Sequence, residues 1–299
     1  MVLLGYEDLT RAAAAVEALG SDDVLAQRRE ALLNDPVVVV TRGSGLRSIH
    51  VLAEEMAIVT PAPHNLDLIA SDDATTCSIV VLVSGGIVAV AHLDAEQQME
   101  FLLKRWEMLG ISGPTRVAIA GGYNDERNIA HPISMDIMKT LTKSEAVYEV
   151  QQFVTGRWNT TQTDNGIRLP RTRGIGYFLA EDAFMQVEFE PDARLPLVPM
   201  RFAGESVHPL HILACCVEND KPLELTIGPY CSTMISPEVC DYMLTLDDNE
   251  LLPRISTSPF AEGPKFLQDM RDMLEFISTC SLRSLGNTLV LTLPSTRKN

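Results

Sequence analysis

The sequence predicts an α+β fold: a sandwich with a largely antiparallel sheet that forms a single domain over residues 1–299. Strand-length apolar runs and helical segments follow one another in mixed order, without the regular βαβ alternation of a parallel sheet. Short hairpin-like turns join several of the runs. No repeat, low-complexity linker or compositional shift marks a boundary, and 299 residues with 46% apolar content suffice for one large core.

The first part of the chain is predicted to form two helices and then short strands. The helices are expected over residues 7–19 and 22–33, with Ser21 as the N-cap of the second, because a serine hydroxyl can accept a hydrogen bond from the first helical turn. Short apolar runs predict strands at Val37–Thr41, Ser48–Leu52 and Met56–Val59.

A β-hairpin is predicted next, from two apolar runs on either side of Ser84-Gly85-Gly86. Cys77 precedes the first run and His92 closes the second. A two-residue loop at Ser84-Gly85 would place Cys77 directly opposite His92, and a loop at Gly85-Gly86 would make them diagonal neighbours on one face. Only a three-residue loop would separate them onto opposite faces.

The remaining elements alternate without a fixed order. Asp94 is expected to cap a helix over Glu96–Leu109 that Gly110 ends, and Arg116–Ala120 is a predicted strand that ends in Gly121-Gly122. Residues 155–172 are polar and are predicted to form an exposed irregular loop. Further helices are expected at about 132–142 and 264–278, and further strands at Val147–Val154, 174–180, 184–190, 211–217, 223–228 and Thr288–Leu293.

Composition excludes several function classes. A net charge of −16 disfavours nucleic acid and favours cationic ligands, among them the α-ammonium group of a peptide. No apolar run of about 18 residues is present, so no membrane association is expected. The N-terminus lacks the basic and apolar regions of a signal peptide. Six cysteines without CxxC spacing predict a reducing compartment, the cytoplasm or the nucleus.

Cys77 and His92 are the first candidates for chemistry. A thiol and an imidazole on one face of a hairpin can form a nucleophile–base pair. The alternative is a small core cysteine and a structural histidine, because free cysteines are commonly buried. The pair alone does not identify a reaction.

Other motifs are weaker. His208 and His211, with Cys215 four residues later, lack the ligand number and rigid spacing of a zinc site, so no metal and no cofactor is expected. His50, His64 and His131 are interpreted as structural or surface residues. Gly121-Gly122 is a tight turn or a place where a ligand approaches the backbone.

Three blocks of sequence resemble the protein N-terminal asparagine amidohydrolase family. They occur in the family's order and extend from about residue 50 to 280. The blocks are Ser71-Asp72-Asp73-Ala74-Thr75-Thr76-Cys77 with His92 and Asp94; Gly121-Gly122-Tyr123-Asn124-Asp125; and Ile227-Gly228-Pro229-Tyr230 with Asp247-Asp248 and Ile255-Ser256-Thr257-Ser258-Pro259-Phe260-Ala261-Glu262.

The resemblance implies a cytosolic or nuclear enzyme of the N-degron pathway. Such an enzyme deamidates N-terminal asparagine of proteins and peptides to aspartate, which then passes to an arginyltransferase. The implied fold is an α-β-β sandwich similar to cysteine deamidases of the cytotoxic necrotizing factor type. The implied catalytic group is Cys77, His92 and, at the position favoured for the serine, Ser71.

Specificity requires groups that recognise the α-ammonium and the side-chain amide. Because a buried unpaired cation is costly, a carboxylate or several carbonyl groups are expected around the ammonium, and Asp72, Asp73 and Glu262 are the candidates. The candidate substrate-binding residues are Asp72, Asp73, Thr75, Thr76, Gly121, Gly122, Tyr123, Ser256, Ser258 and Glu262. Alternatives are a non-catalytic module that binds N-terminal residues, a deamidase of internal glutamine, or a cysteine peptidase.

Overall fold

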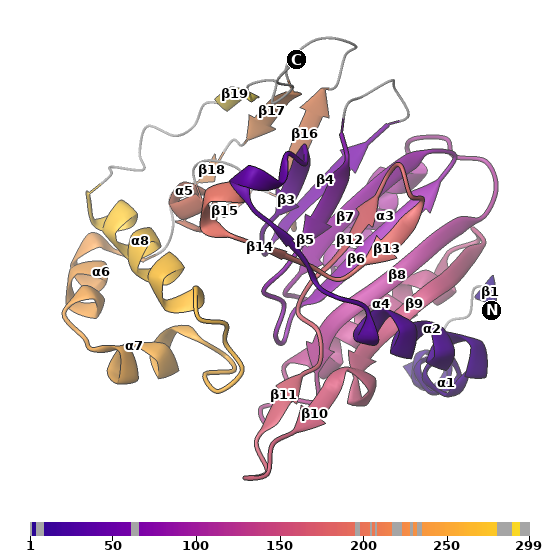
Figure 1. Cartoon of the computed structure of the whole chain (residues 1–299), viewed down its shortest axis with the longest axis horizontal. Helices are drawn as coiled ribbons and strands as arrows, with labels where there is room; N and C mark the ends of the chain where they lie inside the picture. The colour runs from indigo at the N-terminus through magenta and orange to yellow at the C-terminus, as the bar shows by residue number, and fades with distance from the viewer. Residues whose placement is uncertain are drawn as a thin grey trace.

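The computed structural model describes residues 2–3, 9–60, 66–194, 198–203, 205–206, 208–216, 223–227, 230–231, 235–279 and 289–293. These residues form a mixed α/β fold in which a large sheet lies between a helical layer and a smaller sheet (Figure 1). A group of helices from the C-terminal half lies beside the two sheets and carries one wall of the candidate site.

The large sheet has nine described strands and positions the hairpin that the sequence predicts. Antiparallel neighbours predominate, as expected, and only the β9–β8 and β4–β16 pairs are parallel. In spatial order the strands are β1 (Val2–Leu3), β9 (Tyr148–Gly156), β8 (Thr115–Tyr123), β6 (Ser78–Ser84), β7 (Ile87–Leu93), β4 (Glu55–Val59), β16 (His211–Cys216), β17 (Leu223–Ile227) and β19 (Leu289–Leu293).

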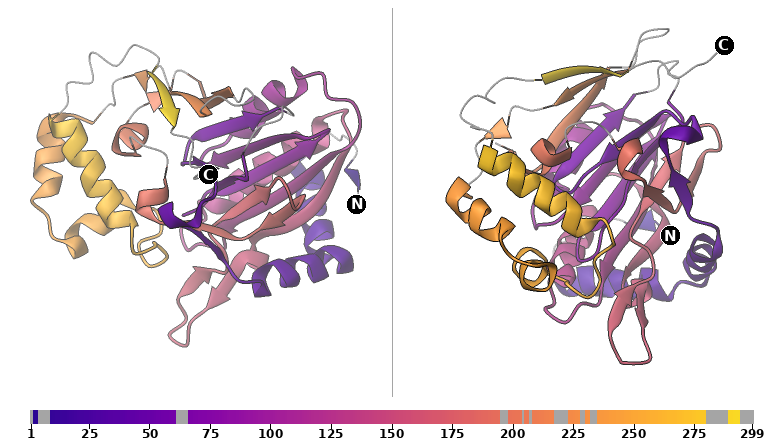
Figure 2. Two further views of the ribbon diagram at one scale, coloured as in Figure 1. Left: turned by 45° about the horizontal axis from the view of Figure 1, so that its top comes forward. Right: turned by 60° about the vertical axis from the view of Figure 1, so that its left-hand side comes forward.

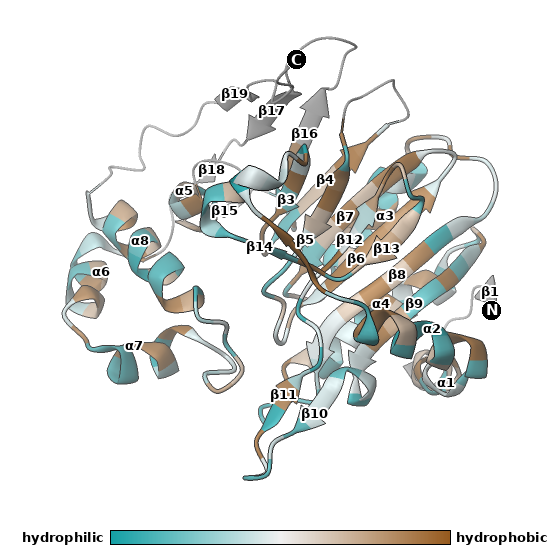
Figure 3. Ribbon diagram, viewed as in Figure 1, coloured by the Kyte–Doolittle hydropathy of each residue, from teal (hydrophilic) through white to brown (hydrophobic). Residues whose placement is uncertain are grey.

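The smaller sheet packs on one face of the large one. Its strands in spatial order are β13 (Ala183–Met185), β12 (Ile175–Phe178), β5 (Leu68–Ser71) and β3 (Ser48–Val51). Alternate residues of β6 serve the two faces: Ile79 and Val81 join the core shared with β3, β5 and β12, whereas Val80 and Leu82 join the core under the helices. A strand buried on both faces reads as a continuous apolar run, and the packed strands are accordingly the most apolar segments (Figure 3).

The helical layer covers the opposite face of the large sheet. Leu19, Leu102 and Ile137 point into this second core, one from each of three helices. The layers therefore follow the order helix, sheet, sheet. The helices are α1 (Leu9–Ser21), α2 (Asp23–Asn34), α3 (Gln98–Glu107) and α4 (Ala130–Lys143).

The remaining helices form a group with its own small core, visible beside the sheets in both views of Figure 2. They are α5 (Val198–Ala203), α6 (Pro237–Leu244), α7 (Asp248–Ile255) and α8 (Phe266–Thr279). A fully buried ion pair joins this group to the sheets: Arg201 of α5 donates from Nε and Nη2 to Glu55 of β4 over 2.8 and 2.5 Å. Losing one partner of such a pair would leave an uncompensated buried charge.

Two expected helix caps are wrong. Ser21 is the last residue of α1, and the N-cap of α2 is Asp22, whose carboxylate accepts a hydrogen bond from Leu25 N–H over 3.0 Å. Asp94 does not cap α3, which begins only at Gln98. Instead the Gln98 side chain bonds both the Asp94 carboxylate and the Asp94 N–H, which delays the helix start by two residues.

The segment 155–172 is not the irregular loop that its polarity predicts. It continues β9 and then forms the short turn η2 (Arg157–Asn159) and a projecting hairpin of β10 (Thr160–Gln162) and β11 (Arg168–Pro170) (Figure 1). Asn159 is fully buried because its side chain bonds Thr172 in both directions. The other described elements are β2 (Val38–Val40), β14 (Val187–Phe189), β15 (Glu205–Ser206), β18 (Tyr230–Cys231), η1 (Arg42–Ser44) and η3 (Pro191–Ala193).

A search of the described helices for membrane spans gives none that is sufficiently long and apolar.

Candidate active site

The β6–β7 hairpin places Cys77 and His92 on one face. Its loop is Gly85-Gly86, so Ile79 pairs with His92 and Cys77, two residues earlier, is a diagonal neighbour. Both glycines have positive φ, 57° and 79°, which a two-residue type I′ turn requires and other residues resist. The loop at Ser84-Gly85 is therefore wrong, and the expectation for Gly85-Gly86 is confirmed.

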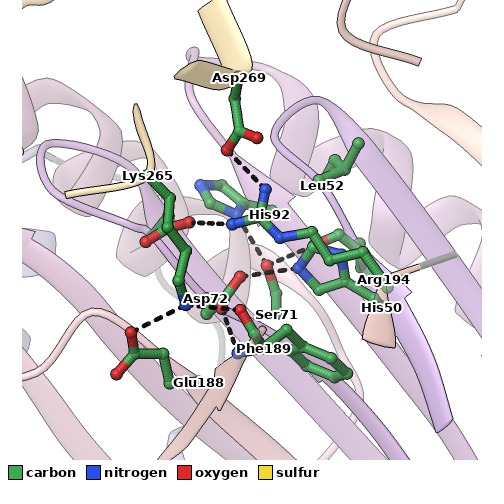
Figure 4. A network of polar contacts seen from close by, with 12 residues as sticks. His50, Leu52, Ser71, Asp72, His92, Glu188, Phe189, Arg194, Lys265 and Asp269 are labelled. Carbon is green, nitrogen blue, oxygen red and sulfur yellow. Dashed lines mark hydrogen bonds and ion pairs between the residues drawn. The ribbon is translucent and has the colours of Figure 1, made fainter. Parts of the chain in front are cut away.

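Ser71, at the end of β5, reaches the imidazole of His92 from behind. Its hydroxyl donates to the Val51 carbonyl over 2.6 Å, and its Oγ lies 2.8 Å from Nδ1 of His92 (Figure 4). Because the single hydroxyl hydrogen is directed to Val51, Oγ must accept from Nδ1–H. Neutral His92 therefore keeps an unprotonated Nε2, which is buried without a hydrogen-bond partner among the described residues.

Cys77 and His92 line one cavity of about 160 Å³. The sheets contribute one wall and the helical group contributes the other, through Phe202, Phe266 and Met270. Most of the predicted site residues meet here. Those that line the cavity are Asp72, Asp73, Thr75, Thr76, Cys77, His92, Ser256 and Glu262.

The thiol of Cys77 and the imidazole of His92 are both neutral. Burial raises the pKa of the Cys77 thiol well above its usual range, and the carboxylates of Asp94 and Glu262 add to this rise. Burial lowers the pKa of His92 to about 4, although the charge of Asp72 acts in the opposite direction. A thiol and a neutral imidazole, rather than a preformed ion pair, therefore face the cavity.

Asp72 is buried and fully engaged by the protein. Its Oδ1 lies 2.7 Å from Nε2 of His50, and its Oδ2 accepts from Phe189 N–H over 2.6 Å (Figure 4). Burial opposes ionisation, but His50 and these hydrogen bonds hold the pKa of Asp72 below its usual value. His50 is therefore buried and bonded to Asp72, which lines the cavity. The interpretation of His50 as a surface residue is wrong.

Asp73 belongs to an ion-pair cluster that reaches α8. Arg194, which is nearly inaccessible, donates to Asp73 over 3.0 Å and to Asp269 over 2.5 Å. Burial and the neighbouring charge of Asp72 raise the pKa of Asp73 to about 7. Through Arg194, this cluster connects Asp73, in the loop before Cys77, with Asp269 of α8 on the helical side of the cavity.

Glu262 has a different surrounding, formed by hydroxyl groups. Its Oε1 accepts from Ser256 and, over 3.1 Å, from Ser258, whose hydroxyl also lies 2.9 Å from that of Thr75. Within the described part of the chain no Lys, Arg or His forms an ion pair with Glu262. Burial raises the pKa of Glu262, and the hydrogen bonds from Ser256 and Ser258 and the charge of Arg173 oppose this rise. Glu262 is thus a carboxylate at the cavity that forms no direct ion pair within the described residues, and the cation whose charge acts on it is Arg173.

Gly121 and Gly122 lie behind Cys77 and do not line the cavity. A Cβ atom at Gly121 would lie 2.6 Å from the Cys77 carbonyl oxygen, and φ is +96°. β8 can approach Cys77 only without a side chain at this position. Tyr123 and Ser258 line a separate hollow of about 350 Å³, which meets the cavity at Thr257.

Gly121→Ala is expected to displace Cys77 and lower both stability and any activity that uses it. Gly113 is the matched control, because it has a similar φ of +100° but an added Cβ atom there would meet nothing within 4 Å. Gly113→Ala should cost about 1 kcal/mol of unfolding free energy through backbone strain alone. Gly121→Ala should cost about 1–3 kcal/mol more through the clash. If chemical denaturation shows that both variants lose the same unfolding free energy, this role of Gly121 is contradicted.

No group of three or more His, Cys, Asp and Glu in the described ranges could hold a metal ion. His208 is exposed and stacks on Phe101 with ring centroids 5.4 Å apart, and His211 is buried. Gly228, Pro229 and His64 lie outside the described residues, as do the side chains of Cys215, Ile227 and Tyr230.

Residues 40–285 match the family described as protein N-terminal asparagine amidohydrolase. This match covers most of the chain. The chain belongs to this family. Membership makes it a hydrolase that acts on an amide.

Individual relatives agree with this membership. The mouse protein named protein N-terminal asparagine amidohydrolase is 26% identical over 88% of this chain and 84% of its own length. The pig protein of the same name is 27% identical over 84% of this chain and 80% of its own. The Arabidopsis thaliana protein of that name is 24% identical over 75% of this chain and 71% of its own.

Sequence reasoning missed the residues that come from distant segments. Phe202, Phe266 and Met270 form the apolar wall, and no local motif marks them. Arg194 and Asp269 were likewise unsuspected. Thr257 lies within the third sequence block and bonds Thr76 over 2.9 Å, so the block itself was a usable signal for that residue.

Proposed function

We propose that the protein deamidates N-terminal asparagine of peptides and proteins to aspartate and releases ammonia. The observation that carries this proposal is a single cavity lined by Cys77 and His92, with Ser71 bonded to His92 from behind, in a chain of the amidohydrolase family. The relatives' shared name supports the choice of N-terminal asparagine as substrate.

The first step is attack by Cys77 on the side-chain amide carbon. Nε2 of His92 takes the thiol proton while Sγ bonds to that carbon, because neither group is ionised beforehand. The backbone N–H of Cys77 is our candidate donor to the oxyanion, a contact typically worth about 3–4 kcal/mol. His92 then returns the proton to the amide nitrogen, the C–N bond breaks, and ammonia leaves a thioester.

Hydrolysis of the thioester completes the cycle. His92 takes a proton from water, and the resulting hydroxide attacks the thioester carbon. The C–S bond then breaks while His92 returns its proton to Sγ, which releases aspartate and restores the Cys77 thiol. Ser71 keeps the proton on Nδ1, so Nε2 is available as base in both steps.

Glu262 is the proposed partner of the substrate's α-ammonium group. Both oxygens of Asp72 are occupied and Asp73 is paired with Arg194, whereas Glu262 forms no ion pair with any described residue and feels the charge of Arg173 only at longer range. An ammonium and a carboxylate that are removed from water together compensate each other's desolvation. Asp73 lines the same cavity and can contribute a second charge.

Hydroxyl groups are proposed to orient the asparagine side chain and the peptide backbone. Thr75, Thr76, Ser256 and Ser258 are the candidates from this region. Glutamine has one methylene more, so its amide carbon would be misplaced relative to Sγ of Cys77. A misplacement of about 1 Å can cost on the order of 100-fold in rate.

The wider setting is part of the same proposal. The helix–sheet–sheet order supports a likeness to cysteine deamidases of the cytotoxic necrotizing factor type. The product would enter the N-degron pathway through an arginyltransferase. We assign the reaction to the cytoplasm or nucleus, where reducing conditions keep Cys77 a free thiol.

The test is ammonia release and mass change with three peptides that begin Asn-Leu, Gln-Leu and acetyl-Asn-Leu. Turnover of the free Asn-Leu peptide alone is the expected result. Turnover of the acetylated peptide would favour an internal deamidase or a peptidase. No turnover by folded protein, together with binding of the Asn-Leu peptide, would favour the non-catalytic module.

At acidic pH, kcat and kcat/KM are expected to fall at different pH values. In the enzyme–substrate complex only His92 must lose its proton, so kcat should fall only near and below pH 4. The free enzyme must also ionise Glu262, whose pKa is raised, so kcat/KM should fall at a higher pH than kcat. Above about pH 8 the substrate's α-amine loses its charge and kcat/KM should fall again. Coincident acid limits would contradict the assignment of Glu262.

A further inference from the structure

His50 and Asp72 form a buried pair beside His92 that the proposed reaction does not use. His50 lies on β3 with 1% of its surface exposed, and Asp72 follows Ser71 directly with 4% exposed. Nε2 of His50 lies 2.7 Å from Oδ1 of Asp72. The other nitrogen, Nδ1, is buried without a hydrogen-bond partner in the described part of the chain, so neutral His50 donates from Nε2 and Asp72 carries the charge.

The reaction has an electrostatic problem that Ser71 does not solve. His92 becomes a cation each time it takes the proton of Cys77 or of water, and it is 3% exposed. A buried cation needs a compensating charge. In the common hydrolase triad the third member is a carboxylate that stabilises the imidazolium, but here the group on Nδ1 is a neutral hydroxyl.

We propose that Asp72, held in place by His50, is a positioning residue whose fixed negative charge stabilises the His92 imidazolium during the reaction. This inference rests on the proposed function. It divides the task of a triad carboxylate between two successive residues, because Ser71 fixes the tautomer of His92 and Asp72 supplies the charge.

The surroundings favour Asp72 for this task over the other carboxylates of the cavity. Asp72 is the carboxylate whose charge raises the pKa of His92, whereas Asp94 and Glu262 act on Cys77. Asp73 is paired with Arg194. Since both oxygens of Asp72 accept hydrogen bonds from the protein, it is poorly suited to bind the substrate ammonium, the role that the sequence suggests.

The charged and titratable groups around the pair come from β3, from the segment after η3 and from α5. His50 faces Asp72 from β3, and Arg194 faces it from the segment after η3. Arg201 of α5 donates to the His50 carbonyl over 2.8 Å, and its charge opposes protonation of His50. β14 contributes the N–H of Phe189. The contacts of Asp72 keep it ionised, and burial, together with the charges of Arg201 and Arg194, keeps His50 neutral against the charge of Asp72.

Asp72→Asn tests the proposal, because it removes the charge and keeps the shape. We expect kcat for the Asn-Leu peptide to fall about 100-fold with little change in KM. The acid limit of kcat should move to lower pH, and alkylation of Cys77 by iodoacetamide at neutral pH should slow. Asp67→Asn is the matched control: Asp67 precedes β5 at its other end, accepts from Arg47 N–H over 2.8 Å, and should leave all three readouts unchanged.

Two variants of His50 keep the test decisive if Asp72→Asn does not fold. His50→Gln retains an N–H donor for Asp72 and should keep most of kcat, whereas His50→Leu should lose it. A raised KM with native kcat in Asp72→Asn would overturn the proposal and make Asp72 a substrate ligand. Equal kcat in the two His50 variants would also overturn it. The proposed function itself fails only if the native protein does not deamidate the peptide.

Discussion

Cys77→Ala is expected to abolish ammonia release from the Asn-Leu peptide. Removing a catalytic nucleophile typically lowers kcat by about 10⁶-fold, because no other group can form the covalent intermediate. The fold should survive the change, since Cys77 is half-buried and precedes Ser78, the first paired residue of β6. The measurement is turnover together with thermal unfolding of the same preparation.

Cys240→Ala is the matched control for this result. Cys240 is fully buried in the helical group and lines no part of the cavity, so its removal should leave turnover unchanged. Mass spectrometry of native protein quenched during turnover should find the thioester on the peptide that contains Cys77. Turnover that survives Cys77→Ala would keep the activity and reject the proposed nucleophile.

The sheets could be predicted where sequence periodicity is strong. The β6–β7 hairpin follows from two apolar runs and a glycine pair, and its register places His92. β5 was missed because it has only four residues and all four are buried, so the run shows no alternation of apolar and polar residues. The predicted first residues of helices were wrong where a side chain forms a hydrogen bond that the sequence does not indicate, as Gln98 does with Asp94.

The helical group was largely beyond sequence reasoning. Only α8 was expected, because its 14 residues form a long amphipathic pattern. α6 and α7 are eight residues each and are stabilised by contacts with α8 rather than by their own propensity. Without these helices the far wall of the cavity could not be placed.

The residues of the candidate site also differ in whether the sequence could predict them. Residues of the compact sequence blocks, such as Cys77 and Thr75, could be named because they are neighbours in the chain. Pairs such as Arg194 with Asp269, or His50 with Asp72, depend on how strands and helices are packed, and no local signal shows which residue partners which. The proposed division between Ser71 and Asp72 could not have been inferred before their partners were known.

Glu262→Gln is expected to lower kcat/KM for the Asn-Leu peptide about 100-fold, mainly by raising KM. Loss of one partner from a buried charge pair costs roughly 3 kcal/mol, because the remaining ammonium is then desolvated without compensation. The pairing is the same in the ground state and in the transition state, so kcat should change little. Glutamine retains an oxygen that can accept from Ser256 and Ser258, so the local fold is kept.

The acetylated peptide supplies the decisive comparison for Glu262. The acetylated peptide has no ammonium group, so the native enzyme should reject it. In Glu262→Gln the ratio of kcat/KM for the free peptide to kcat/KM for the acetylated peptide should be smaller than in the native enzyme. Glu107→Gln is the control for the change in net charge, because Glu107 is exposed at the end of α3, its carboxylate accepts a hydrogen bond from Ser144, and it does not line the cavity. If this ratio of kcat/KM values is unchanged in Glu262→Gln, Glu262 does not bind the ammonium group. Asp73, another carboxylate that lines the cavity, would then be the candidate.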